Sequence, residues 1–209
     1  MSRHFNTRSK FIGAVAAAAR AAALVPSVAA ANTWFGSSLN HDPANAGSSC
    51  SNDDSVPPPM CTHVGSFYPG FSGRAKSPVN GTIVAFKVRA QGPTTMTFRV
   101  VRVRNMSSDN NHGRARAIAR GRTVHVQGPS QDQADNGIYP IERFAAHLKV
   151  HKGDEIAIDT TSNTAEYCSD GTPGQLTFTP FLALSHSFRS STGVDGCLML
   201  VQAVVRAGH

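Results

Sequence analysis

The sequence predicts an all-β protein: a single antiparallel β-sandwich of jelly-roll type, with an N-terminal signal peptide and an arm held by a disulfide. Three observations lead to this fold class. Short segments of alternating polar and apolar residues recur along 76–209, turn residues (Gly, Pro and Asn) separate them, and no helical pattern of useful length follows residue 31. Short strands at regular spacing are typical of sandwiches and related barrels, and 209 residues suit one domain.

Residues 1–31 have the three parts of a secretory signal peptide. A basic start carries Arg3, Arg8 and Lys10, an apolar stretch reads FIGAVAAAARAAALV, and SVAAAN offers small residues for cleavage. We therefore expect a secreted, extracellular protein. The net charge of the chain is +7, and it falls to +3 without the four basic residues of this segment. Most of the overall basicity therefore belongs to targeting.

Residues 32–75 are rich in Ser, Asn, Gly, Pro and Asp. This composition predicts a loop-rich, extended arm in front of a sandwich domain at 76–209.

Four cysteines in a secreted chain predict two disulfides. They are Cys50, Cys61, Cys168 and Cys197, and three pairings are possible. The sequential pairing is the simplest, because Cys50–Cys61 closes a loop in the arm and Cys168–Cys197 ties a strand end to the last strand. A zinc site on these cysteines is disfavoured, since no CxxC pair is present and only His63 lies near Cys61.

Two alternating strands open the sandwich domain. The inward side chains of the first, which follows an Asn-Gly turn, are Val84, Phe86 and Val88. Those of the second are Met96, Phe98 and Val100. The consecutive Val100 and Val101 predict either a bulge or a strand buried on both faces.

The next segment, GRARAIARGRTVHV at 113–126, is predicted to be a strand with a solvent-exposed face that carries the arginines. The arginines and the two valines share one parity, so an unbroken strand would place both on one face. Gly121 therefore marks a bulge or a break where the register changes. The alanines before it and the valines after it then face the core.

The second half of the domain contains loops, a hairpin and a closing strand. GPSQDQADNG is predicted as a loop, and Lys-Gly-Asp at 152–154 as the turn of a hairpin with Leu148, Val150, Ile156 and Ile158 inside. Pro180 indicates an edge or a bend. Residues 198–205 are apolar at both odd and even positions, which predicts a central strand buried on both faces.

Three segments resemble a class of secreted jelly-roll proteins from actinobacteria. They are SPVNGTIVAFKVRA with TFRVVRVR, then AHLKVHKGDEIAID, then GCLMLVQAVV. The likeness covers roughly residues 40–205. It implies a jelly-roll fold and secretion, and it adds little about activity.

A non-enzymatic, extracellular or cell-surface binding module is the leading expectation, with a polysaccharide or a protein as ligand. Sandwich modules bind sugars on exposed aromatic rings, and the candidates here are Trp34, Tyr68 and Tyr139. Packing of these rings against the sandwich is the competing interpretation.

Anion binding is the alternative function. Residues 74–122 carry eleven Lys and Arg and one acid, a local charge of +10. The candidate patch consists of Arg99, Arg102, Arg104, Arg114, Arg116, Arg120 and Arg122. Its ligand would be a nucleic acid or an acidic envelope polymer, and of these two partners nucleic acid is disfavoured. The competing interpretation is that the acidic remainder of the chain neutralises the block.

A hydrolase of unrecognised type is a further alternative, but no catalytic residue is assigned. No GxSxG motif is present, and most of the thirteen acids lie in turns. The one candidate for a calcium site is Glu155 with Asp159 and Asp170, for which a solvated hairpin end is the competing interpretation. No cofactor, no other metal and no membrane span are expected, and the sequence does not indicate an oligomeric state.

Overall fold

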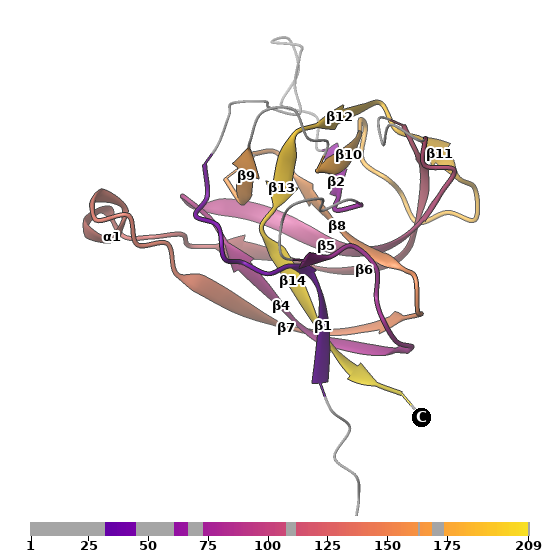
Figure 1. Ribbon diagram of the computed structural model, residues 1–209, viewed down its shortest axis with the longest axis horizontal. Coiled ribbons are helices and arrows are strands. Elements are labelled where there is room, and N and C mark those ends of the chain that lie inside the picture. Colours follow the sequence, from indigo (N-terminus) through magenta and orange to yellow (C-terminus); the bar gives the residue numbers. More distant parts are fainter. Residues whose placement is uncertain are drawn as a thin grey trace, which may run out of the picture.

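Strands make up almost all of the regular structure of this protein (Figure 1). The computed structural model describes residues 32–44, 61–66, 73–107, 112–162, 164–168 and 174–208. In this part of the chain, all pairings between named strands are antiparallel. The all-β, antiparallel prediction is confirmed, while the predicted signal peptide, 1–31, lies outside the described residues.

One sheet has five strands in the order β3-β1-β14-β4-β7. Their bounds are β1 Asn32–Ser37, β3 Gly73–Arg74, β4 Gly81–Arg89, β7 Ile141–Val150 and β14 Val201–Ala207. β14 is the middle strand, as predicted from its apolar residues at both odd and even positions. Val201, Ala203 and Val205 are fully buried. The apolar run divides at Leu200, however, and its first part joins a different sheet.

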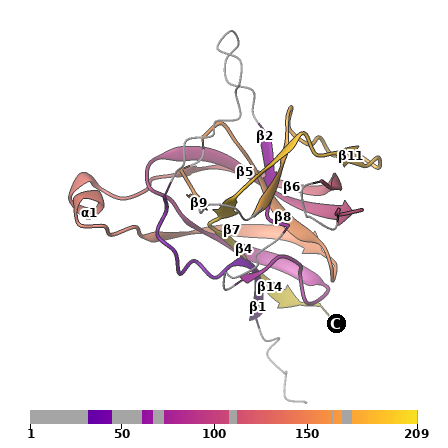
Figure 2. The ribbon, with the colours of Figure 1, turned by 45° about the horizontal axis from the view of Figure 1, so that its top comes forward.

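A second sheet has seven strands in the order β11-β6-β5-β8-β2-β10-β12. Their bounds are β2 Cys61–Val64, β5 Thr94–Arg104, β6 Arg114–Val126, β8 Glu155–Thr160, β10 Gln175–Phe178, β11 Arg189–Ser190 and β12 Gly193–Asp195. A third, two-stranded sheet pairs β9 Glu166–Cys168 with β13 Cys197–Met199. The views in Figures 1 and 2 place β9 and β13 near the end of the large sheet that holds β2, β10 and β12.

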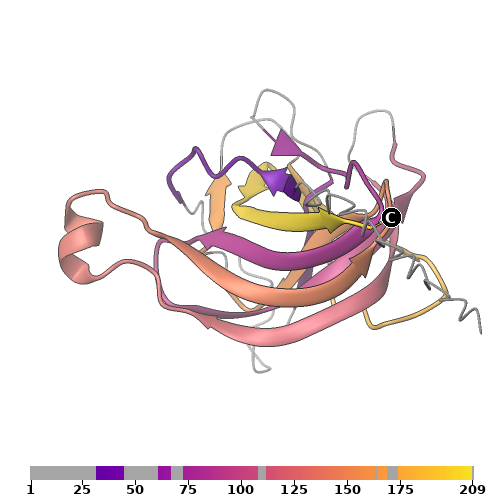
Figure 3. The ribbon, with the colours of Figure 1, turned by 90° about the horizontal axis from the view of Figure 1, so that it is seen from below.

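The two large sheets share one apolar core. Phe86 of β4 and Phe98 of β5 belong to different sheets, and their rings stack with centroids 4.1 Å apart. Phe144 of β7 adds a third ring, 6.0 Å from Phe98. Burial of such side chains stabilises a fold by about 2 kcal/mol each. From below, β4, β7 and β6 are seen to curve side by side around this core (Figure 3).

The outer face of the seven-stranded sheet is covered as well. The covering segment, residues 179–190, follows β10 and contributes Leu182 to a second apolar cluster with Val101, Ala117 and Phe178. This layer explains why every residue of β8 is buried. Val100 faces the inner core and Val101 the outer cluster, and both are fully buried. The prediction of a strand buried on both faces is confirmed.

The bulge predicted at Gly121 is confirmed. Thr97 lies opposite Thr123 and Arg99 opposite Arg120, so Gly121 and Arg122 together oppose a single residue of β5. Ala115 and Ala117 are buried before the bulge, and Val124 and Val126 after it. A second bulge occurs at Ile118 of β6, where the register shifts between Val100 and Val101. The sequence pattern indicated a bulge as one alternative at these two valines, but on β5 rather than on its partner strand.

The first strand differs from its prediction at Val84. β14 pairs Val204 with Ala85 and Val205 with Ile83, so Val84 is an extra residue on β4. A bulge of this kind turns the strand locally. Ile83 is therefore fully buried instead of Val84, while Phe86 and Val88 are buried as predicted.

The loop predicted at GPSQDQADNG contains a short helix, α1 Gln131–Asp135. Ser130 accepts from the backbone of Gln133, and the Gln133 side chain accepts from the backbone of Ser130, which is a capping box. The three-residue spacing of Ser130 and Gln133 is typical of a helix start, but the turn-rich composition of the segment favoured a loop. α1 projects away from both sheets and has no buried residue (Figures 1 and 3).

Parts of the predicted arm are strands of the large sheets. β1 lies between β3 and β14, and β2 lies between β8 and β10. The remaining stretches of 32–75, including Cys50 and Tyr68, are outside the described residues.

The disulfide predicted between Cys168 and Cys197 is present and joins β9 to β13. Cys61 is also disulfide-bonded.

No helix among the described residues is long and apolar enough to cross a membrane.

A buried ion pair lies between the seven-stranded sheet and the covering segment. The guanidinium of Arg99, 1% exposed, donates from Nε to both carboxylate oxygens of Asp159 at 2.7 and 2.6 Å. Thr62 of β2 donates to the same carboxylate at 2.6 Å and accepts from the backbone N–H of Leu182 at 2.8 Å. Three strands and the covering segment are thus joined through one carboxylate.

We expect Asp159→Asn to lower the free energy of unfolding by about 3–5 kcal/mol, because it leaves a buried guanidinium without its counter-charge. Urea denaturation of the purified protein measures the change. Asp42→Asn is the matched control: it removes the exposed partner of Arg89, and such pairs contribute less than about 1 kcal/mol. Equal losses in the two variants would contradict the structural importance of the Arg99–Asp159 pair.

Candidate functional site

A groove with cationic walls lies between the β5–β6 strand pair and the covering segment. β11, which pairs with the start of β6, marks this edge of the seven-stranded sheet in Figure 1. The groove consists of two adjoining hollows of about 450 and 390 Å³ that share His186. We call it the cationic groove, and its described lining is Arg102, Arg104, Asn105, Arg114, Arg116, Ala117, Ile118, His151, Leu184, Ser185, His186, Ser187 and Phe188.

Strands β5 and β6 supply the arginines, and the covering segment supplies the opposite wall. Arg104 lies over the ring of Phe188 at 4.1 Å from the centroid, and Arg116 lies over the same ring at 5.0 Å. Cation–π contacts of this type hold both guanidinium groups beside the ring.

Two of these arginines also hold the covering segment in place. Arg114 donates to the carbonyl of Phe188 and Arg116 to the carbonyl of His186, each at 2.9 Å. Each hydrogen bond uses one of the five N–H groups of a guanidinium, so further donors remain for a ligand.

The groove has little negative charge to offset its cations. Its described lining contains no carboxylate. The carboxylate of Asp154 lies behind it, is fully buried, accepts from Arg102 at 2.7 and 2.9 Å and also accepts from the backbone N–H of His151. Asp154 therefore neutralises Arg102, whereas Arg104, Arg114 and Arg116 form no ion pair with another described residue.

The seven arginines of the predicted anion patch divide into three groups rather than forming one surface. Arg99 and Arg102 are paired with Asp159 and Asp154. Arg104, Arg114 and Arg116 surround Phe188 in the cationic groove. Arg120 and Arg122 lie farther along β6: Arg120 lies between its two bulges, and Arg122 is part of the second.

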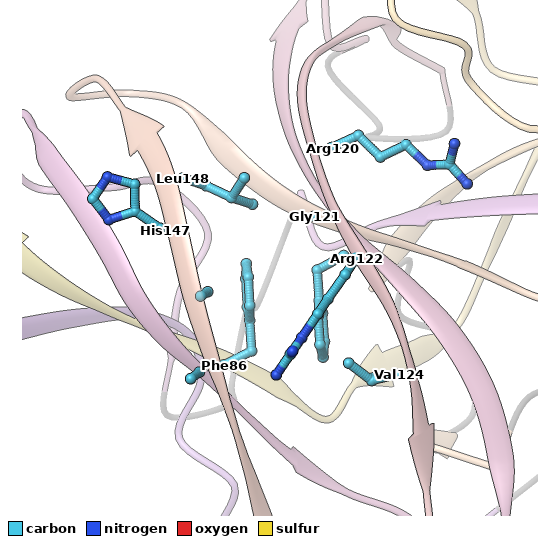
Figure 4. Close-up of a pocket in the computed structure, with 10 residues that line it drawn as sticks. Phe86, Arg120, Gly121, Arg122, Val124, His147 and Leu148 are labelled. Atoms are coloured by element: carbon cyan, nitrogen blue, oxygen red, sulfur yellow. The ribbon is translucent and has the colours of Figure 1, made fainter.

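A separate pocket of about 440 Å³ opens between β6 of the seven-stranded sheet and β7, an edge strand of the five-stranded sheet. Its lining includes the stacked Phe86 and Phe98. In Figure 4, Leu148 and Arg122 extend into the space from facing strands, while Arg120 points away from it. An apolar floor beside one cation suits the apolar part of a small anionic ligand.

A buried group of polar side chains lies under β9 and β13. The Nδ1 atom of His63 on β2 is 3.5 Å from Glu166 Oε1 on β9 and 3.8 Å from Asp195 Oδ2 on β12. Burial lowers the pKa of His63 to about 4 and raises that of Asp195. We therefore describe His63 as a neutral imidazole, although its distances to two carboxylates resemble those of ion pairs. The sequence analysis missed this group because its members are far apart in the chain.

The predicted calcium ligands have other roles in the structure. The Asp159 carboxylate is bonded to Arg99 and Thr62, and Asp170 lies outside the described residues. Glu155 is 1% exposed, and burial is the main cause that raises its pKa to about 8. A hydrogen bond from Ser66 and the charge of Lys76 act in the opposite direction.

The predicted sugar-binding aromatics are not brought together. Trp34 on β1 is partly buried, with the guanidinium of Arg74 5.5 Å from its ring. Tyr139 follows α1, and its carbonyl accepts from Arg89 at 3.0 Å. Tyr68 is not among the described residues.

Comparison with protein-family models, with curated proteins and with solved structures gives no match for this chain. The function must therefore be argued from the geometry of the chain itself.

The raised pKa of Glu155 predicts a pH-dependent stability. The folded protein keeps this carboxyl protonated up to about pH 8, whereas the unfolded chain ionises it near pH 4.5. Stability from this group is therefore fully present below about pH 4.5 and is lost as pH rises toward 8, with a slope of at most about 1.4 kcal/mol per pH unit.

We expect Glu155→Gln to remove this component. The free energy of unfolding, measured between pH 5 and 9, should fall less steeply for Glu155→Gln than for the wild type, and both curves should run parallel above pH 8. Asp132→Asn, on the exposed α1, should follow the wild type. Parallel curves for wild type and Glu155→Gln at all pH values would show that the carboxyl is ionised in the folded state.

Proposed function

We propose that this protein is a secreted, non-enzymatic binding module for an acidic polysaccharide, which it holds in the cationic groove. The observation that carries the proposal is the group of three arginines around Phe188, in a groove whose described lining has no carboxylate. Guanidinium groups bind carboxylates and sulfates through paired, charge-assisted hydrogen bonds.

The other groove side chains suit the neutral part of such a polymer. Ser185, His186 and Ser187 are exposed and can hydrogen-bond to sugar hydroxyls, and Leu184, 57% exposed, offers an apolar contact. The ligand would therefore be recognised by its charge and by its hydroxyl groups together.

The state of Phe188 favours a polysaccharide over a nucleic acid. Proteins that hold single strands stack the bases on open aromatic rings. Arg104 and Arg116 lie against the ring of Phe188, so it is a support for the two guanidinium groups rather than a platform for bases.

The same lining favours binding without cleavage. Glycoside hydrolysis uses two carboxyl groups on either side of the scissile bond. The described residues of the groove provide arginines, histidines and serines instead. The proposed secretion rests on the signal-peptide pattern of 1–31, the proposed arm on the composition of 32–75, and the proposed jelly-roll topology on the strand pattern of 76–209. With such a signal peptide, the module would act outside the cell.

The proposal predicts binding to polygalacturonate or chondroitin sulfate, but not to neutral dextran, in affinity electrophoresis or calorimetry. Binding should weaken steeply as salt rises, because counterions are released when the charges pair. Arg104→Glu should weaken binding at least about tenfold, the equivalent of about 1.4 kcal/mol. The variant should still fold, because Arg104 is exposed and its contact with the ring of Phe188 is not part of the apolar core.

Two further variants separate charge from structure. Arg143→Glu makes the same charge change on the exposed side of β7 and should leave binding near the wild-type value. Arg116→Lys keeps the charge but loses the paired donors and the hydrogen bond to His186, and should weaken binding less than Arg104→Glu does. Equal effects of Arg104→Glu and Arg143→Glu, or tighter binding to single-stranded DNA than to either polysaccharide, would overturn the proposal.

A further inference from the structure

The buried group around His63 has the composition of a metal site. One imidazole nitrogen and two carboxylate oxygens, from His63, Glu166 and Asp195, lie within 4.8 Å of one another. These side chains come from β2, β9 and β12, and the first two are no more than 2% exposed. Neutral imidazole and carboxylate are the nitrogen and oxygen ligands that zinc takes in proteins.

The two distances from His63 Nδ1 to the carboxylate oxygens are close to those of tetrahedral coordination. With metal–ligand bonds of about 2.1 Å, two ligands of a tetrahedral zinc ion are about 3.4 Å apart. The Nδ1 atom of His63 is 3.5 Å from Glu166 Oε1 and 3.8 Å from Asp195 Oδ2. Small side-chain adjustments would complete the geometry, and one position would remain for water or another donor.

Each of the three side chains is oriented by a second contact. His63 Nε2 lies 3.0 Å from Cys61 Sγ, which has no proton to give in a disulfide, so Nε2–H is the donor and Nδ1 is the atom that faces the carboxylates. Gln175 donates to Glu166 Oε1 at 2.8 Å, and the backbone N–H of Cys197 donates to Asp195 Oδ1 at 3.2 Å. Such outer contacts are typical of metal-binding histidines and carboxylates.

We propose that His63, Glu166 and Asp195 bind one divalent transition-metal ion of the zinc class. The ion links β2 and β12 of the seven-stranded sheet to β9 of the two-stranded sheet, next to the Cys168–Cys197 disulfide. The site is independent of the cationic groove, because the two share no residue.

Metal content and thermal stability test this site. The full chain is stripped with EDTA, dialysed and titrated with ZnCl₂. We expect one zinc ion per chain by elemental analysis and a rise of several degrees in the midpoint of thermal unfolding, since a ligand that binds only the folded state stabilises it. Co²⁺ in place of zinc should give the strong visible absorption of a four-coordinate ion.

Asp195→Asn tests the assignment with little risk to the fold, because the Asn oxygen can still accept from Cys197 and the side chain is 17% exposed. This variant and His63→Gln should lose both the zinc-dependent rise and the Co²⁺ bands. His147→Gln, which removes an exposed histidine on β7, should keep both. Less than one-tenth of a zinc ion per chain, or an undiminished rise in Asp195→Asn, would overturn the proposal.

Discussion

The buried pair of Arg99 and Asp159 is the interaction on which the outer half of the structure depends. Two opposite charges in an apolar layer are stable only if their geometry and their remaining hydrogen bonds are satisfied. The Asp159 carboxylate accepts from Arg99 and Thr62 together, whereas Nη1 of Arg99 has no hydrogen-bond partner among the described residues. Because Thr62 also accepts from Leu182, the pair determines where the covering segment lies.

The cationic groove is a consequence of that placement. The covering segment brings Phe188 and His186 against β6, where Arg114 and Arg116 bind their carbonyls. One wall is a rigid strand pair and the other is a segment fixed by side chains of that pair. The arginines are therefore held in position before any ligand arrives, which reduces the ordering cost of binding.

Local patterns predicted the parts of the fold that depend on alternation. The faces of the strands around Phe98 and Ile158, the central position of β14 and the bulge at Gly121 all follow from the parity of apolar residues. α1 and the bulge at Val84 were missed, because a capping pair and a single extra residue are short-range details within stronger patterns.

The site was harder to predict, because charge in a sequence does not reveal burial. Arg99 and Arg104 sit in the same alternating strand, yet one is a core residue and the other a groove residue. Which of them is buried depends on the covering segment, some 80 residues later. The group around His63 combines three distant segments. The pairing of β2, β10 and β12 brings His63 near Asp195, and Glu166 joins them from β9 of the two-stranded sheet.

The two bulges of β6 have a consequence for the behaviour of separate copies of the chain. β11 pairs only with Arg114 and Ala115, so in the described structure the far part of β6 borders the sheet. A long, flat border strand is a template for pairing with another molecule, and natural proteins prevent this with twists and charges. The bulges at Ile118 and Gly121 bend this border, and Arg120 and Arg122 place like charges along it. Charges at these two positions disfavour edge-to-edge pairing between neighbouring molecules.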